Sequence, residues 1–378
     1  MSSRPSYLTA VSRFLTLVLV AASAAGARKP VASTAAPAAS WPTTNWPVSS
    51  PAEQGLDADR LGALVRLIDE GERFPDLHSL LVVRHGSLVL EAYFAGQEAD
   101  DLHMLQSVSK SFTSAIIGIA IEQGLIAGVD EPVLDFFPGI EGVDNLDDRK
   151  RAMTVEDLLT MRSGTDYHER GPDSPHFQLN RMNRGWTEFI LSRPMINDPG
   201  THFQYDSGGV ILMSALIRAR TGKHADAFMA EHLFEPLGIE RRRWYRNAEG
   251  HPHLGGGLHL TSRDMAKFGL LYLRQGRWED RQIVPAEWVA ASTRRHVEFA
   301  PQYRPFAGYG YLWWILPPAV EDGTHPDIFA ACGFRAQYIF VIPEHEMVVV
   351  VTGSTRNSTD QGAPLRFLYS HILPAIVN

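Results

Sequence analysis

The sequence contains very little cysteine and lysine. Cys332 is the only cysteine among the 378 residues, so no disulfide can form within the chain and no zinc site can be built from thiolates. Only five lysines occur, and arginine fills the other basic positions. One of the five, Lys110, lies inside an otherwise apolar segment. A lysine in such a segment stands out, because this residue is rarely buried without a partner.

Positive charge is scarce overall. The formal net charge is -8 at pH 7, and no stripe of lysine and arginine is present, which argues against a nucleic-acid partner. No His-Glu-x-x-His segment or similar histidine pair indicates a metal site, and no cofactor is expected. The Gly-x-Ser-x-Gly segment of the α/β-hydrolases is also missing, so that route to a serine enzyme is not supported.

No hydrophobic run is long enough to cross a membrane. Residues 14–22 are apolar, follow two arginines and precede small residues, a pattern typical of a secretory signal peptide cleaved after Ala24 or Ala27. The run is too short to span a bilayer, and no cysteine follows it to carry a lipid. We therefore expect residues 1–27 to be removed on export, no stable membrane anchor, and a periplasmic or secreted location.

Composition and pattern divide the rest of the chain. Residues 28–50 are rich in alanine, proline, serine and threonine, which predicts a flexible linker. One folded domain then covers residues 51–378. Its strands are expected at about 51–100 and 255–378, and its middle, about 101–254, is expected to be mainly helical.

The predicted strands favour an antiparallel sheet. Residues 80–94 indicate a β-hairpin that turns at His85-Gly86, and 310–315, 337–342 and 347–352 are further strands. Only four residues join the last two, which requires antiparallel pairing. The expected fold is of the α/β class in its α+β form: an antiparallel sheet from both ends of the chain, flanked by helices, with a helical insertion. Helices are predicted at 56–71, 107–124, 154–161, 186–191, 210–221, 262–274 and 363–377.

The segment that begins at Ser107 carries the clearest chemical signal. It predicts a helix buried nearly all round, and residues three apart share one face of a helix, so the Lys110 amine can reach the Ser107 hydroxyl. A serine becomes a nucleophile when a neighbour takes its proton. Burial and a helix N-terminus lower the pKa of a lysine and so prepare it as that base. A chance Ser-x-x-Lys is the alternative at this point.

Further segments resemble those of the serine β-lactamase-like superfamily, in the same order along the chain. The resemblance is to class C β-lactamases, related esterases and 6-aminohexanoate-dimer hydrolases, and it covers about residues 52–375. It implies a β-lactamase/transpeptidase-like fold and an acyl-enzyme on Ser107. The matching segments are Gln106-Ser-Val-Ser-Lys-Ser-Phe112, Thr154-Val-Glu-Asp-Leu-Leu-Thr-Met-Arg-Ser-Gly164, Pro199-Gly-Thr-His-Phe-Gln-Tyr205, Gly255-Gly-Gly-Leu-His-Leu-Thr-Ser-Arg-Asp264, and Gly333 with Gln337.

The second motif of that superfamily is Tyr-x-Asn, matched here by Tyr205-Asp206-Ser207. The resemblance implies that Tyr205 shares proton transfer with Lys110, and the positive charge of the lysine is expected to hold the phenol closer to its phenolate form. Ser207 replaces the frequent asparagine and keeps a polar, shorter group for substrate binding.

The third motif is Lys-Thr-Gly, and Ala331-Cys332-Gly333 stands in its place. Gly333 allows close approach of the strand backbone to the substrate, and the N–H groups of Phe334 and Ser107 are expected to form the oxyanion hole. The lysine that would bind a substrate carboxylate is missing. Arg335, expected on the same face of the strand, is the candidate substitute.

The sequence thus predicts an exported serine hydrolase that cleaves a small ester or amide. Trp186, Trp313 and Trp314 are candidates for an apolar substrate pocket, with core packing as the alternative. A β-lactamase or D-alanyl carboxypeptidase is the first alternative function, and the missing lysine counts against it. The second is a non-catalytic, penicillin-recognising binding module, against which the intact Ser107 and Lys110 argue. No oligomeric state is predicted.

Overall fold

The computed structural model describes residues 41–70, 74–140, 143–300, 305–318 and 327–377. The predicted signal peptide and the first part of the linker, up to residue 40, lie outside these ranges.

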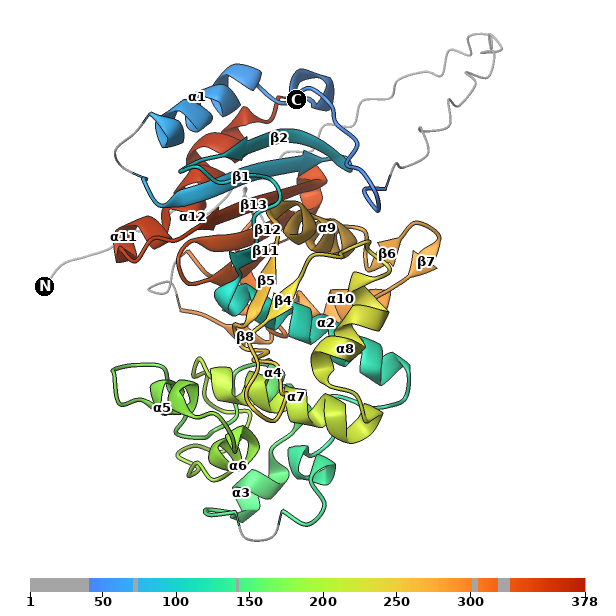
Figure 1. Cartoon of the computed structure of the whole chain (residues 1–378), viewed down its shortest axis with the longest axis vertical. Coiled ribbons are helices and arrows are strands. Elements are labelled where there is room, and N and C mark those ends of the chain that lie inside the picture. Colours follow the sequence, from blue (N-terminus) through green and yellow to red (C-terminus); the bar gives the residue numbers. More distant parts are fainter. Residues whose placement is uncertain (1–40, 71–73, 141–142, 301–304, 319–326, 378) are drawn as a thin grey trace, which may run out of the picture. The chain divides into compact units, whose positions relative to one another are not determined.

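The predicted antiparallel sheet is confirmed. It has eight strands in the order β2-β1-β13-β12-β11-β10-β9-β8, and each pair of neighbours is antiparallel. Strands from the two ends of the chain lie side by side, with β1 next to β13 (Figure 1). The strands are β1 Leu77–Arg84, β2 Ser87–Tyr93, β8 Val297–Glu298, β9 Gly308–Tyr309, β10 Trp314–Leu316, β11 Ile328–Gly333, β12 Gln337–Ile342 and β13 Met347–Gly353.

Two turns show how local chemistry sets the strand lengths. The β1–β2 hairpin turns at His85 and Gly86, as predicted, and both have a positive φ, at 51° and 84°, which suits a two-residue hairpin turn. The single strand predicted over 310–315 is wrong. Leu312 has φ 62° and its carbonyl accepts a hydrogen bond from Ser111 Oγ at 2.8 Å, so the chain turns there and forms β9 and β10 instead.

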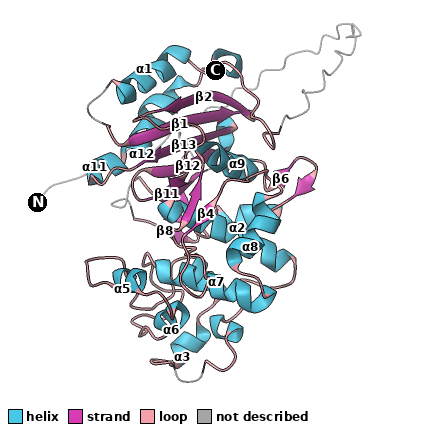
Figure 2. Ribbon diagram, in the orientation of Figure 1, coloured by secondary structure: helices cyan, strands magenta, loops and turns pink. Residues whose placement is uncertain are grey.

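The sheet is buried on both faces, and alternate side chains enter two separate cores. Leu80 and Val82 of β1 pack with α1 (Ala58–Asp69) and with the C-terminal helical segment, α12 (Ala363–Phe367) and the turns that follow it. Leu81 and Val83 belong to the larger core. That core also contains α2 (Ser109–Glu122) and α9 (Ser262–Leu273). Figure 2 shows helices on both sides of the sheet.

The middle of the chain is mainly helical, as predicted, and side chains cap the start of several of its helices. Thr154 and Asp157 form a capping box at the start of α4. Asp206 caps α7 by accepting the Gly209 N–H at 3.0 Å. The helices are α3 Asp148–Ala152, α4 Val155–Leu159, α5 Pro175–Arg181, α6 Trp186–Leu191, α7 Ser207–Thr221 and α8 Ala225–Met229, with α10 Ala286–Ser292 and α11 Ser358–Gln361 further on.

Two small sheets complete the described chain. One has the order β3-β5-β4 and the other pairs β6 with β7. The first is relevant to function because β3 leads directly into the turn that carries Ser107. The strands are β3 His103–Met104, β4 Arg243–Trp244, β5 Leu258–Leu260, β6 Arg277–Trp278 and β7 Arg281–Gln282.

Residues 41–50 differ from the flexible linker predicted there. The Trp41 ring lies 5.1 Å from that of Trp278, Thr43 Oγ1 accepts the Trp278 indole N–H at 2.9 Å, and Val48 forms a bridge to Leu88. Alanine- and proline-rich composition does not reveal these contacts, because they depend on two tryptophans distant in sequence. None of the helices in the described ranges combines the length and hydropathy needed to cross a bilayer.

Candidate active site

Ser107 lies at the entrance to α2. It belongs to a single 3₁₀ turn, Gln106–Val108, and not to the helix itself, which begins at Ser109. Gln106 has φ 51°, a conformation that costs a non-glycine residue energy and often marks a functional site. The predicted reach between the two residues is confirmed, because Lys110 Nζ lies 2.9 Å from Ser107 Oγ.

Lys110 is held in a dry and well-defined position. Its side chain is 1% exposed, and its second hydrogen bond goes to the carbonyl of Gly255 at 2.6 Å. Burial lowers the pKa of Lys110 to about 8, while the carboxylates of Glu169 and Asp206 act in the opposite direction. A substantial fraction of the amine is therefore neutral at mildly alkaline pH, and a neutral amine can accept a proton.

The loop that supplies the Gly255 carbonyl is tied to α2 on both sides. Thr113 Oγ1 donates to the Leu254 carbonyl at 3.2 Å, and Ser109 Oγ accepts the Leu258 N–H at 3.2 Å. These hydroxyls come from the buried face of α2. The glycine cluster and the helix therefore form one unit that fixes the Lys110 amine.

Tyr205 lies against Lys110, as the motif implies. Lys110 Nζ is 4.9 Å from the centre of the Tyr205 ring, and the other side of the ring stacks on Trp314, with the ring centres 5.6 Å apart. The expected shift toward phenolate is wrong. Burial and the charge of Glu169 raise the pKa of Tyr205 well above its ordinary value, although a hydrogen bond with Ser107 opposes the rise. The phenol is therefore protonated and has a proton to donate.

Ser207 is the first residue of α7 and is 2% exposed. Its N–H donates to Glu169 Oε1 at 3.1 Å. The adjacent Asp206 side chain accepts a hydrogen bond from Ser163 Oγ at 2.8 Å, and burial raises the pKa of Asp206 to about 6. The second motif is thus anchored by two carboxylates.

Gly333 closes the opposite side of the site. A Cβ at Gly333 would lie 2.4 Å from the Leu105 carbonyl oxygen and 3.2 Å from the Gln106 Cβ, so any larger residue would displace the turn that carries Ser107. The glycine is therefore required for the approach of β11 to this turn, rather than for approach to a substrate alone. Phe334, the next residue, has an exposed side chain, and its N–H as a partner in the oxyanion hole stays a prediction.

Arg335 is not on a strand, contrary to expectation. It lies in the β11–β12 turn with φ 67°, and its Nε is buried without a hydrogen-bond partner. The strand ends at Gly333, and Gln337 fixes the turn by donating to the Arg335 carbonyl at 3.1 Å. Cys332 is half-buried and packs against the smaller core, and burial of the thiol raises its pKa well above the ordinary value.

Of the three tryptophans, Trp314 is the one at the site. It lines a pocket of about 1020 Å³ together with Tyr205. Trp186 was predicted to bind substrate, but it is 2% exposed, does not line this pocket, and donates its indole N–H to the Met182 carbonyl at 3.1 Å. Trp313 is fully buried. The remaining residues of the pocket are Asp166, His168, Glu169, Arg170, Ile196, Thr201, His202, Phe203, Gln204, Val297, Glu298, Phe299 and Phe306.

The sequence did not point to two residues of this site. Glu169 follows the second matching segment by five residues and gives no signal beyond lying in a charged loop. His253 precedes the glycine cluster by two residues. It is 5% exposed, neither ring nitrogen has a partner, and burial together with the charge of Lys110 lowers its pKa to about 3. His253 is therefore a neutral imidazole.

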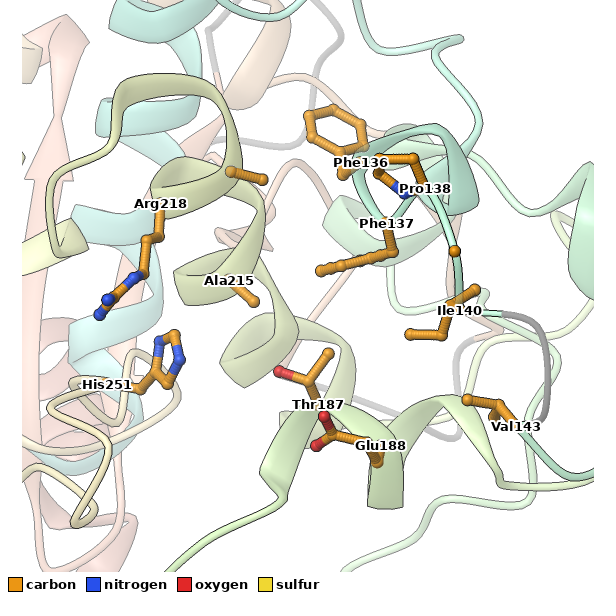
Figure 3. A pocket seen from close by; sticks show the side chains of 12 residues that line it. Phe136, Phe137, Pro138, Ile140, Val143, Thr187, Glu188, Ala215, Arg218 and His251 are labelled. Carbon is orange, nitrogen blue, oxygen red and sulfur yellow. The ribbon is translucent and has the colours of Figure 1, made fainter.

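A second pocket lies elsewhere in the helical part. Its volume is about 710 Å³. Figure 3 shows Arg218 of α7 and His251 on one side of this pocket and Phe137, Ile140 and Val143 on the other. It shares no lining residue with the pocket beside Tyr205. Within the described ranges, no group of three or more histidine, cysteine or acidic side chains could hold a metal ion.

The chain is similar to known proteins in sequence and in fold. The family model Beta-lactamase matches residues 64–370. A 6-aminohexanoate-dimer hydrolase of Paenarthrobacter ureafaciens is 26% identical over 320 residues, which cover 77% of this chain and 78% of that protein.

Two solved structures illustrate the likeness in fold. EstCE1, a hydrolase with promiscuous acyltransferase activity, has a TM-score of 0.71 at 18% identity over 85% of this chain and 100% of that chain. A class C beta lactamase of Rhodobacter sphaeroides has a TM-score of 0.63 at 16% identity, over 82% of this chain and 97% of that chain.

Proposed function

The chain belongs to the beta-lactamase family of serine hydrolases, and from that premise we propose that it cleaves an ester or amide bond through an acyl-enzyme on Ser107. The observation that carries the proposal is the 2.9 Å hydrogen bond between Lys110 Nζ and Ser107 Oγ. This bond joins a nucleophile to its base, because burial lowers the pKa of Lys110 to about 8 and the neutral amine can accept a proton.

Each side chain has one task in the proposed reaction. Neutral Lys110 takes the Ser107 proton as Oγ attacks the carbonyl carbon, and the carbonyl electron pair moves onto oxygen. The N–H groups of Ser107 and Phe334 stabilise that oxyanion. Tyr205 then delivers a proton to the leaving group as its bond to carbon breaks. Water hydrolyses the ester on Ser107 in the second half of the cycle, with Lys110 and Tyr205 in the reverse roles.

Replacing Tyr205 by phenylalanine tests the proton-donor role. Phenylalanine retains the ring that stacks on Trp314 but cannot carry a proton. We expect kcat to fall by about 10²–10³-fold, more for an alkyl ester than for a p-nitrophenyl ester, because a good leaving group needs no proton. Steady-state kinetics on both esters measure the difference. Equal losses on the two substrates would assign Tyr205 to packing instead.

The substrate preference follows from the third motif. A carboxylate that enters a partly dry cleft needs a cation to replace its lost hydration. Ala331 stands where the superfamily has this lysine, and it is buried. The pocket beside Tyr205 presents four other aromatic side chains to a substrate, Phe203, Phe299, Phe306 and Trp314. These features support simple esters or amides over penicillins as substrates.

We expect short-chain esters to be hydrolysed faster than β-lactams. The missing charge-assisted contact should cost about 1.5–3 kcal/mol, or roughly one to two powers of ten in kcat/KM. The test compares nitrocefin with p-nitrophenyl butyrate in the wild type and in Ala331→Lys, with Arg335→Ala to remove the cation that follows the third motif. Efficient nitrocefin hydrolysis by the wild type that survives Arg335→Ala would favour the β-lactamase or carboxypeptidase alternative.

We also propose that the enzyme is exported. The support is the apolar run at 14–22 with small residues up to Ala27. Expression of the full chain in a bacterial host with a secretory system should yield a protein that begins after Ala24 or Ala27 in the periplasm or medium. Intact-mass measurement decides the matter, and an exported protein that still begins at Met1 would contradict it.

A further inference from the structure

Glu169 contacts the segment that carries Tyr205 and lines the pocket beside it. It lies in the loop between α4 and α5, and its Oε1 accepts the N–H of Ser207 at 3.1 Å. Ser207 follows Tyr205 by two residues, so this bond holds the segment that carries the phenol. The same carboxylate lines the pocket beside Tyr205. It therefore combines a structural bond with a charge at the reacting groups.

That charge acts on Lys110 through space. Burial disfavours the ammonium form of Lys110, and the negative charge of Glu169 is the larger of the two carboxylate effects that favour it. The second carboxylate, Asp206, is committed to Gly209 and Ser163 by hydrogen bonds of 3.0 and 2.8 Å. Glu169 lines the pocket and is bonded to Ser207, which packs against Gly255, the residue whose carbonyl accepts the Lys110 amine.

We propose that Glu169 is a positioning residue that sets the charge on Lys110 during catalysis and thereby sets the lower pH limit of the reaction. This inference rests on the proposed acyl-enzyme function. In the resting enzyme the carboxylate favours the ammonium, which cannot act as a base. Once Lys110 has taken the Ser107 proton, the same charge stabilises the ammonium that must persist beside the oxyanion.

The other groups that face this pair come from several elements, and none of them replaces Glu169. Tyr205 and Tyr167 are protonated phenols, since burial raises both pKa values. His176, which hydrogen-bonds to Tyr167, and His253 have lowered pKa values because of burial and the charge of Lys110. The groups that interact electrostatically with Lys110 or Glu169 are Asp206 of the α7 cap, Tyr205, Tyr167, His176 of α5, His253 and Tyr309 of β9. Asp166, His168, Arg170, His202 and Glu298 line the same pocket as Glu169.

The variant that isolates the charge is Glu169→Gln. Its amide oxygen can still accept the Ser207 N–H, but the negative charge is gone. Without it Lys110 loses its proton at lower pH, so the acid limb of kcat/KM moves to lower pH. The ratio of variant to wild-type kcat/KM should be about three- to tenfold larger at pH 6.5 than at pH 9.5. Glu169→Asp keeps the charge and should lose rate without moving the limb.

Glu249→Gln is the matched control. Glu249 Oε2 also accepts a backbone N–H just before a helix, that of Gly185 at 3.0 Å, but it is not among the charges that act on Lys110. Its loss should leave the pH profile unchanged. If Glu169→Gln lowers kcat/KM by the same factor at every pH, the carboxylate only holds Ser207 in place and the inference is wrong.

A measurement that needs no activity separates this inference from the proposed function. The chain has five lysines, so the side-chain NMR signals of a ¹³C,¹⁵N-lysine sample are few, and the Lys110 signal is the one lost in Lys110→Met. Its titration midpoint should fall in Glu169→Gln and stay in place in Glu249→Gln. An unmoved midpoint overturns the inference. A shifted midpoint in a protein without Ser107-dependent hydrolysis supports the charge effect and overturns the proposed function.

Discussion

Ser107→Ala should abolish ester hydrolysis while leaving the fold intact. We expect kcat/KM for p-nitrophenyl butyrate to fall by at least about 10⁴-fold, because a nucleophile and its base act as one unit and loss of either disables both. Ser107 is half-buried at the start of α2, and its hydroxyl contacts the Lys110 amine. Removing one oxygen from that position creates no large cavity, so the thermal unfolding midpoint should change little.

Ser114→Ala provides the matched control for this experiment. Ser114 lies on α2, the helix that follows Ser107, and is buried, but it is remote from the nucleophile in sequence by about two helical turns. The control should keep activity within about threefold of the wild type. Substantial hydrolysis by folded Ser107→Ala protein would exclude an acyl-enzyme on this serine.

Lys110→Met should have the second largest effect. Methionine matches the length of the lysine stem and removes the amine, so Ser107 loses its proton acceptor. We expect kcat/KM to fall by about 10³–10⁴-fold. The buried amine is costly to hold in a charged form, so the variant should be no less stable than the wild type, which thermal unfolding can verify.

Lys150→Met tests whether the loss belongs to the site or to buried lysines in general. Lys150 is fully buried and, like Lys110, donates to backbone carbonyls, those of Leu191 and Arg193. Its replacement should affect stability but not the activity of the folded fraction. A Lys110→Met enzyme that retains its rate above pH 9 would show that another group takes the Ser107 proton.

The nucleophile and its base could be predicted because the relevant spacing is local. Ser107 and Lys110 are three residues apart, and either a helix or the 3₁₀ turn that is present brings them together. The β1–β2 hairpin and the β12–β13 pair were equally predictable, because their apolar strands are joined by short connections that can be read from the sequence. The short strands β8, β9 and β10 were not, because the chain turns at Leu312.

The protonation state of the site could not be predicted in the same way. The pKa of Tyr205 depends on burial and on Glu169, a residue whose position is set by a loop 36 residues earlier in the sequence. Only the folded chain places that carboxylate beside the Ser207 N–H. The resemblance placed the charge of Lys110 beside Tyr205, whereas nothing in the sequence indicated the burial of the phenol or the charge of Glu169.

Errors at single positions have a similar origin. Arg335 follows a strand by two residues, which suggested continuation of the strand, but the strand ends where Gly333 meets the Leu105 carbonyl. Trp186 was a candidate for the substrate pocket because it is a large aromatic residue. In the fold it is buried, and its indole N–H donates to the Met182 carbonyl. In both cases a long-range contact overrides the local pattern.

The most direct test of the account is to identify the residue that becomes covalently modified. The full-length protein is incubated with a fluorophosphonate, which reacts with activated serines, and is then digested and analysed by tandem mass spectrometry. The account predicts one adduct per chain on Ser107, formed faster at pH 8.5 than at pH 6.5 and missing in Lys110→Met. An adduct on any other residue, or none on a folded enzyme that hydrolyses esters, would contradict it.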